Sequence, residues 1–224
     1  MTKTANYEFP SFDEIFDDEN RFLLYAHPSR VAKMVAHLEA YRRVLDVPGA
    51  IIECGVFKGS SFVTLATFRQ LLDPMPDRQL VGFDTFADFP LTDFEPDVAK
   101  REAFVREAGS QSVGREELEA ILERKGLAAN VQLVAGNILE TLPTFVDANP
   151  ALRVALLNLD TDIYEPARVI LEHLWPRMSP GGVVMLDDYG VFEGETKAVD
   201  EYFAGQAITI EELPYRATPR LLTK

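Results

Sequence analysis

Residues 51–61, with the sequence IIECGVFKGSS, constrain the fold of this chain more than any other segment. An apolar run leads into Glu53, a glycine turn follows, and Gly59 precedes a helical pattern. A strand, a tight turn and a helix in this order bring backbone N–H groups to the carboxyl end of a buried strand. Sheets of α/β proteins bind nucleotide-like cofactors at that place. We therefore expect a cofactor site at this turn.

The glycine spacing distinguishes this turn from a dinucleotide-binding loop. Gly55 and Gly59 form the pattern G-x-x-x-G, whereas dinucleotide-binding folds carry G-x-G-x-x-G. Both glycines would allow a sharp turn and a close approach to the backbone. The carboxylate of Glu53, just before the first glycine, would repel a pyrophosphate and suit a ligand with an amino group. A tight connection without any ligand is the alternative.

The other apolar segments alternate between strand and helix patterns, which predicts one α/β domain over residues 25–224. From residue 28 an apolar stripe at helical spacing predicts a helix whose stripe is mostly core: Val31, Met34, Val35, Leu38, Tyr41 and Leu45. The strands expected after the first one are 80–83, 131–135, 152–159 and 183–186, followed by an antiparallel edge hairpin of 208–210 with 221–223.

An acidic and aromatic arm, residues 1–24, precedes this domain. It contains Tyr7, Phe9, Phe12, Phe16 and Phe22 among Asp and Glu residues. So many aromatic residues do not fit a solvated tail, and we expect the arm to pack on its own domain or on a second subunit. The arm therefore predicts a homodimer or a larger homo-oligomer.

An insertion of about 85–128 is longer than a connection from a strand to a helix needs. Its Phe-rich loop is followed by two charged helical patterns, roughly 97–108 and 114–125. Because the insertion leaves the carboxyl edge of the sheet, it is well placed to cover a site as a lid. An ordinary helical insertion is the alternative.

The charge balance restricts the partners. The 224 residues carry a formal net charge of −14, which disfavours binding to nucleic acid and to an anionic membrane surface. The single cysteine, Cys54, lies in the first expected strand, so no disulfide can form within the chain. Without a signal pattern or a long apolar run, we expect a soluble, cytoplasmic protein that acts on a small molecule.

Acidic residues end four of the expected strands, and parallel strands bring their carboxyl ends to one edge of a sheet. These residues are Glu53, Asp84, Asp160 and the pair Asp187 and Asp188. Carboxylates gathered so closely repel one another unless a cation lies among them, and carboxylate oxygens suit Mg²⁺, Ca²⁺ or Mn²⁺. An acidic rim without a metal is the alternative, with Asp162 as the N-cap of the next helix.

Four segments carry a resemblance to a known family. In order, ECGVFKGSS, GFDTFADFP, LNLDTDIYEP and MSPGGVVMLDDYG resemble the successive signatures of the macrocin O-methyltransferase family, over roughly residues 25–204. That family comprises class I methyltransferases that use S-adenosylmethionine to methylate sugar and phenol hydroxyls in natural-product pathways. The resemblance implies a Rossmann-like, seven-stranded mixed sheet with helices on both faces and an antiparallel last strand. It also implies Mg²⁺ dependence.

The resemblance also implies roles for particular residues. Glu53, Gly55 and Ser61 would hold the methionine end of the cofactor. The first segment also resembles catechol O-methyltransferase at these three residues, and that enzyme binds its metal at the places that correspond to Asp160, Asp187 and Asp188. Asp84 would hold the ribose. Asp160, Asp187 and Asp188 would bind the metal. The full set expected to contact the cofactor is Glu53, Gly55, Phe57, Ser60, Ser61, Asp84, Thr85, Gly136, Asn137 and Asp160.

For the proton transfer that O-methylation needs, we expect Asp160 to act both as a metal ligand and as the base. His27 precedes a Pro-Ser helix start beside the expected cofactor and is the reserve base. Two other functions stay open at this point. A nicotinamide-dependent oxidoreductase or epimerase is disfavoured by the glycine spacing, and a non-catalytic dimerising homologue is disfavoured by the intact acidic residues.

Overall fold

The computed structural model describes residues 12–73, 75 and 77–224. The predicted α/β fold is confirmed: seven strands form one mixed sheet in the order β3-β2-β1-β4-β5-β7-β6. The first five strands run parallel, and β7 is antiparallel to both β5 and β6. The strands are β1 (Ala50–Cys54), β2 (Leu80–Asp84), β3 (Val131–Ala135), β4 (Val154–Leu159), β5 (Met178–Leu186), β6 (Ile210–Leu213) and β7 (Arg216–Thr223).

The order of the strands reverses between β1 and β4, which are neighbours in the sheet but far apart in the chain. In sheets of this type the crevice outside the carboxyl ends of such a pair is where ligands bind. Both strands are buried along their whole length, as their mostly apolar sequences predict, and each also buries one polar residue, Glu53 in β1 and Asn158 in β4.

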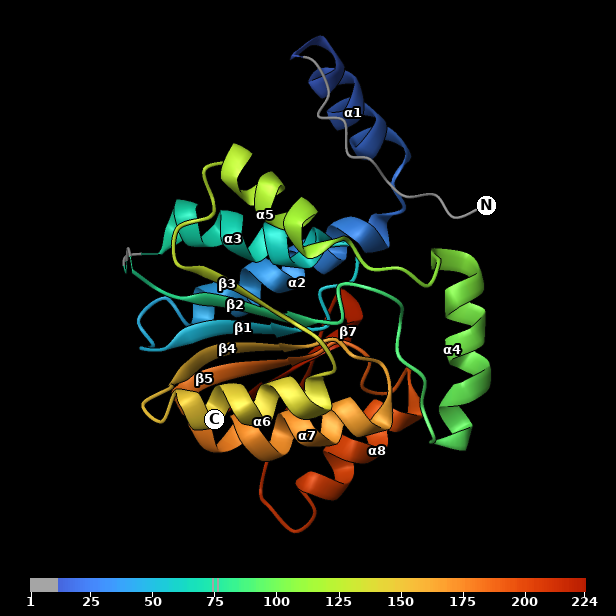
Figure 1. Cartoon of the computed structure of the whole chain (residues 1–224), viewed down its shortest axis with the longest axis vertical. Helices are drawn as coiled ribbons and strands as arrows, with labels where there is room; N and C mark the ends of the chain where they lie inside the picture. Colours follow the sequence, from blue (N-terminus) through green and yellow to red (C-terminus); the bar gives the residue numbers. More distant parts are fainter. Residues whose placement is uncertain (1–11, 74, 76) are drawn as a thin grey trace.

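Helices cover both faces of the sheet (Figure 1). One face carries α2 (Pro28–Arg43), α3 (Ser60–Leu72) and α5 (Arg115–Arg124), whose apolar residues form one core with the sheet. The opposite face carries α6 (Ile138–Ala148), α7 (Tyr164–Leu174) and α8 (Glu193–Tyr202), which form the second core. A short 3-10 helix, Trp175–Arg177, leads into β5.

Two sequence-based expectations about local structure are wrong. The stripe of α2 is not mostly core: Val31, Met34 and Val35 are exposed, and the buried face is Ala36, His37, Ala40 and Tyr41. Small alanines allow α2 to lie close to the sheet, so burial follows them and not the larger side chains. The strand expected at 183–186 begins earlier: β5 starts at Met178 and contains an irregularity, where its pairing with β4 shifts register.

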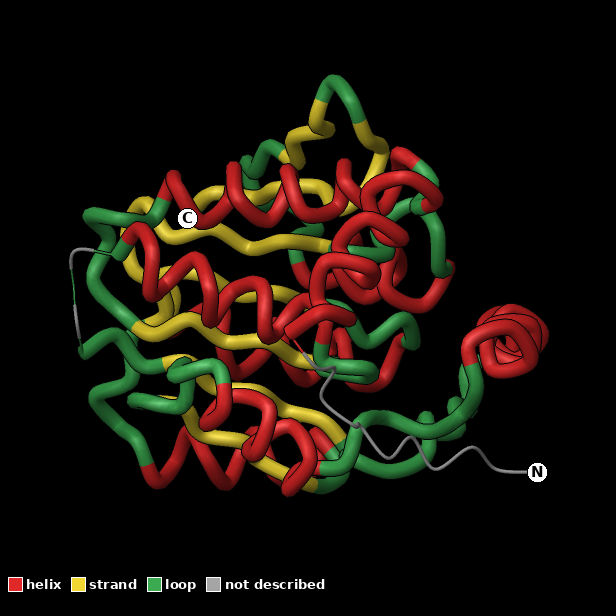
Figure 2. The backbone as a smooth tube through the Cα atoms, turned by 90° about the horizontal axis from the view of Figure 1, so that it is seen from above, coloured by secondary structure: helices red, strands yellow, loops and turns green. Residues whose placement is uncertain are grey.

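Two helices stand outside the helical layers. In Figure 1, α1 (Phe12–Tyr25) projects away from the body and α4 (Glu95–Ala108) stands beside it; Figure 2 shows α4 nearly end-on. The described part of the N-terminal arm is thus a helix, with Leu24 73% and Tyr25 80% exposed, while residues 1–11 lie outside the described range. Among the described helices, none has both the length and the apolarity to cross a bilayer.

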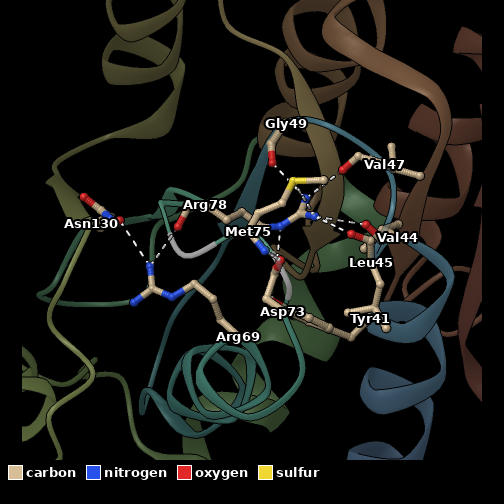
Figure 3. Close-up of polar contacts among 10 residues, drawn as sticks. All are labelled: Tyr41, Val44, Leu45, Val47, Gly49, Arg69, Asp73, Met75, Arg78 and Asn130. Carbon is tan, nitrogen blue, oxygen red and sulfur yellow. Dashed lines mark hydrogen bonds and ion pairs between the residues drawn. The ribbon is translucent and has the colours of Figure 1, made fainter.

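A buried ion pair joins several segments at the amino end of the sheet (Figure 3). Arg78 Nε lies 2.5 Å from Asp73 Oδ2, and both side chains are only 1% exposed. Tyr41 donates a hydrogen bond to the same carboxylate oxygen at 2.8 Å. The guanidinium of Arg78 also donates to backbone carbonyl oxygens between α2 and β1, at Val44, Leu45, Val47 and Gly49. We call Tyr41, Asp73 and Arg78 the amino-end cluster.

Candidate active site

The turn between β1 and α3 has a backbone that few residues could adopt. Gly55 has φ 91°, and a Cβ there would lie 1.7 Å from the carbonyl oxygen of Asp160. Phe57, two residues later, has φ 47°, an unusual value for a non-glycine residue. The close approach of Gly55 brings the turn into direct contact with the end of β4. The expected sharp turn is therefore present, and it touches the acidic edge.

Asp84, at the end of β2, holds this turn. Its Oδ2 accepts hydrogen bonds from the backbone N–H groups of Val56 and Phe57, both at 2.9 Å. Its Oδ1 accepts a hydrogen bond from Phe86 N at 2.7 Å and a longer one from Thr85 Oγ1 at 3.4 Å. Most of the accepting capacity of Asp84 is therefore used within the protein, which sequence reasoning did not foresee.

A cavity of about 940 Å³ opens beside this turn and reaches the acidic edge. Nine of the ten residues expected to contact the cofactor line it: Gly55, Phe57, Ser60, Ser61, Asp84, Thr85, Gly136, Asn137 and Asp160. The tenth, Glu53, is fully buried just behind the wall and accepts a hydrogen bond from Ser61 Oγ at 2.5 Å. Burial raises the pKa of Glu53 well above its usual range, and its Oε2 has no partner among the described residues.

Three carboxylates meet at the carboxyl ends of β4 and β5. Asp160, Asp187 and Asp188 each present one oxygen within 4.8 Å of the others, and we call them the carboxylate cluster. Burial and the neighbouring Asp187 raise the pKa of Asp160. Burial, followed by Asp162, raises the pKa of Asp188. A group of acids that destabilise one another's charge in this way has a strong electrostatic demand for a cation.

The residues fit a divalent metal ion by their donor chemistry. Asp187 Oδ1 and Asp188 Oδ2 are buried and lack hydrogen-bond partners in the described structure. Orphaned carboxylate oxygens are costly unless something coordinates them, and three carboxylates are a suitable donor set for Mg²⁺ or Mn²⁺. The three residues that the sequence predicts as metal ligands are thus brought together.

One lysine already contacts the carboxylate cluster. Lys33, on α2, places its Nζ 3.1 Å from Asp160 Oδ2 and 2.7 Å from Asp187 Oδ2. Burial alone would lower the pKa of Lys33, but the two carboxylates outweigh it and raise the pKa. Sequence reasoning missed Lys33, although it lies one turn from His37 on the same helix and so was open to prediction by helical spacing.

The histidine that lies at the cavity is His37, and the choice of His27 as reserve base is not supported. His27 is the N-cap of α2, where its Nδ1 accepts a hydrogen bond from Ser29 N at 3.2 Å, and it is not among the residues that line the cavity. His37 lines the cavity, is 2% exposed, and has a buried Nε2 without a described partner. Burial, followed by the charge of Lys33, lowers the pKa of His37 to about 4, so its imidazole is neutral near pH 7.

The capping role expected for Asp162 is wrong. The N-cap of α7 is Ile163, whose own side chain makes no capping hydrogen bond. Asp162 instead has φ 63° and shares a hydrogen bond with the Asp188 carboxyl. A hydrogen bond between two carboxyls requires one of them to carry a proton. The strained backbone at this position therefore turns Asp162 toward the carboxylate cluster.

The insertion forms another wall of the cavity, with Phe89, Pro90 and Phe104 among its lining residues. It is anchored through Asp97, a fully buried residue of α4, whose carboxylate accepts hydrogen bonds from Tyr164 N at 3.2 Å and Gly194 N at 2.9 Å. These are the first turns of α7 and α8, whose backbone N–H groups need acceptors. The insertion therefore contributes to the cavity wall, and its helix α4 is held to the rest of the domain by Asp97.

A sheet with an antiparallel β7 next to β5, and a glycine turn that borders a large cavity after β1, define the fold of a class I methyltransferase. Residues 28–213 match the macrocin O-methyltransferase family (TylF), and the chain belongs to that family. The resemblance carried by the four sequence segments is thereby confirmed.

Similar proteins of known name come from actinobacterial natural-product pathways. The chain is 34% identical to 8-demethyl-8-(2,3-dimethoxy-alpha-L-rhamnosyl)-tetracenomycin-C 4'-O-methyltransferase of Streptomyces olivaceus, over 65% of this chain and 54% of the relative. It is 30% identical to demethyldecarbamoylnovobiocin O-methyltransferase of Streptomyces niveus, over 74% of this chain and 64% of the relative. The chain thus spans between about half and two thirds of the length of these relatives.

Solved structures agree on the fold. The calicheamicin methyltransferase CalS11 superimposes with a TM-score of 0.75 at 28% identity, covering 97% of this chain and 87% of CalS11. The O-methyltransferase NovP superimposes with a TM-score of 0.73 at 26% identity, covering 86% of this chain and 79% of NovP.

Proposed function

We propose that this protein transfers a methyl group from S-adenosylmethionine to a hydroxyl of a sugar or a sugar-bearing small molecule, with the help of a divalent metal ion. The observation that carries the proposal is that one cavity borders both the glycine turn after β1 and the carboxylate cluster. Relatives with names such as tetracenomycin 4'-O-methyltransferase support the sugar as the methylated part.

The cofactor would lie along the turn. We propose that Glu53, Gly55 and Ser61 hold its methionine end, with the buried Glu53 carboxylate suited to an ammonium group. The adenine would lie by Gly136 and Asn137, which line the cavity. Asp84 would receive the ribose hydroxyls on Oδ1, because its contact with Thr85 Oγ1, at 3.4 Å, is the longest and most easily replaced of its four.

At the other end of the cavity, the carboxylate cluster would hold the metal, which when bound lowers the pKa of an acceptor hydroxyl and orients it. Asp160 belongs to that cluster and also touches the cofactor turn through its backbone, next to Gly55. We propose that Asp160 takes the proton of the acceptor hydroxyl. Holding donor and acceptor in line in one cavity would supply much of the acceleration.

Calorimetric titration with S-adenosylmethionine and with NAD⁺ tests the cofactor directly. S-adenosylmethionine should bind and NAD⁺ should not, whereas the reverse would favour an oxidoreductase on a similar sheet. Asp84→Ala should weaken S-adenosylmethionine binding by about tenfold or more, since hydrogen bonds to a charged group contribute roughly 1.5–3 kcal/mol each. Asp88→Ala, in the same loop, is the matched control, because Asp88 accepts a hydrogen bond from Ser110 and does not line the cavity.

Chelation tests the metal. TDP-rhamnose serves as the assay acceptor, because the similar protein CalS11 is named a TDP-rhamnose 3'-O-methyltransferase, and turnover is measured as formation of S-adenosylhomocysteine. EDTA should abolish turnover and leave S-adenosylmethionine affinity nearly unchanged, and Mn²⁺ or Mg²⁺ should restore it. Full activity after chelation would rule out the metal.

We also propose that the protein forms a homodimer or a larger homo-oligomer through the exposed apolar side chains of α1 and α2. These include Ile15, Leu23 and Leu24 on α1 and Val31 and Val35 on α2. Light scattering at micromolar concentration should give more than the 25.1 kDa of one chain, and Leu24→Asp should lower the measured mass. A monomeric wild-type protein would contradict this proposal.

A further inference from the structure

Lys33 is the basic side chain that the described contacts place among the acidic groups of the site. Its ammonium contacts Asp160 and Asp187, two of the three members of the carboxylate cluster. Glu53, Asp162 and Glu195 are further carboxyl groups whose charges interact with those of the cluster. Glu53 and Glu195 are fully buried. Several buried carboxylates therefore share one nearby positive charge.

Lys33 lies where the carboxylate cluster needs a positive charge. The Nζ atom contacts one oxygen of Asp160 and one of Asp187, while Asp187 Oδ1 and Asp188 Oδ2 are left without a described partner. A single ammonium thus compensates the cluster in part. A divalent ion would bring twice the charge and could engage oxygens that a lysine on α2 leaves orphaned.

We propose that Lys33 is a built-in counter-cation of the carboxylate cluster, which holds the acidic side chains together without metal and competes with the divalent ion for them. The inference rests on the metal site of the proposed function. Because the ammonium and the metal ion need the same carboxylates, the affinity for metal is set by the free energy of moving Lys33 away as well as by the ligands.

Two consequences separate this role from that of a simple surface lysine. Removing the ammonium should tighten metal binding, because nothing has to be displaced from Asp160 and Asp187. The same change should destabilise the metal-free protein, because buried like charges lose their compensation. Both effects should be absent at a lysine outside the site.

The experiment compares wild type, Lys33→Met and Lys33→Arg, with Lys125→Met as control. Methionine keeps the length and the apolar stem of lysine, and Lys125 is an exposed residue just after α5. Mn²⁺ binding is followed by the electron paramagnetic resonance signal of the free ion. We expect Lys33→Met to bind Mn²⁺ at least tenfold more tightly than wild type, and Lys33→Arg and Lys125→Met to stay close to it.

Thermal unfolding gives an independent readout. In EDTA, Lys33→Met should unfold several degrees below wild type, and saturating Mn²⁺ should raise its unfolding temperature more than that of wild type. If a folded Lys33→Met binds Mn²⁺ equally or more weakly, the competition is wrong. If no variant binds Mn²⁺, the proposed competition between Lys33 and the metal ion is also wrong. Titration of the same samples with S-adenosylmethionine then tests the methyltransferase assignment separately.

Discussion

The amino-end cluster and the carboxylate cluster are groups of charged side chains at opposite ends of the same sheet, and they differ in how their charges are matched. In the amino-end cluster, one arginine meets one aspartate, and the remaining donors of Arg78 reach backbone carbonyl oxygens. In the carboxylate cluster, three acids share one lysine, and two oxygens are orphaned. A matched group stabilises a fold, whereas an unmatched group is ready to receive a ligand.

The largest expected effect concerns the amino-end cluster. Arg78→Met should reduce the free energy of unfolding by about 3–5 kcal/mol, because it leaves Asp73 buried without its partner. Urea denaturation followed by circular dichroism measures this. Arg168→Ala is the control, since its ion pair with Glu172 is exposed and such pairs contribute only about 0–1 kcal/mol. Equal effects of the two changes would show that burial does not raise the contribution of a matched ion pair.

Two changes at the other end of the sheet distinguish the base from its neighbour. Asp160→Asn should lower turnover by about 100-fold or more, as expected for loss of a general base. Asp162→Asn should be milder, because an asparagine amide can still donate a hydrogen bond to Asp188. Turnover is measured at saturating cofactor, together with Mn²⁺ affinity. An inactive Asp162→Asn beside an active Asp160→Asn would move the base to Asp162.

The neutral imidazole next to Lys33 predicts a dependence of stability on pH. The unfolded chain protonates His37 near pH 6.5, whereas the pKa in the folded protein is about 4. Between these values the unfolded state binds more protons, so the contribution of His37 to stability is lost as pH falls below 6.5. Relative to His37→Asn, wild type should lose about 1.5 kcal/mol between pH 6.5 and 5. A constant difference between the two unfolding free energies would contradict a buried neutral His37.

The smallest expected effect is a change of stability in the amino-end cluster. Tyr41→Phe removes one hydrogen bond to Asp73 and keeps the buried ring, so it should cost about 0.5–1.5 kcal/mol. Tyr215→Phe is the control, because its hydroxyl donates to Glu39 on the exposed surface. Both are measured by urea denaturation. A larger loss for Tyr215→Phe would show that burial does not set the value of these bonds.

The sequence was sufficient for the sheet and for the expected cofactor contacts that line the cavity. Largely apolar runs such as Val154–Leu159 predict buried strands, and acids at strand ends must share one edge in a parallel sheet. The exposure of Val31, Met34 and Val35 could not be predicted, because the side of a helix that is buried depends on what packs against it. Asp162 turns toward Asp188 because its backbone adopts a positive φ angle, which no sequence pattern predicts.

The anchoring of α4 through Asp97 limits how small molecules can enter and leave the cavity. Moving α4 outward would break the hydrogen bonds from Tyr164 and Gly194 together, leaving a buried carboxylate and two helix starts without partners. The segment just before α4 is held as well, because Thr92 Oγ1 and the backbone N–H groups of Asp93 and Phe94 donate hydrogen bonds to Glu165 of α7. A small molecule would therefore have to enter and leave the cavity without displacing α4, which acts as a fixed post.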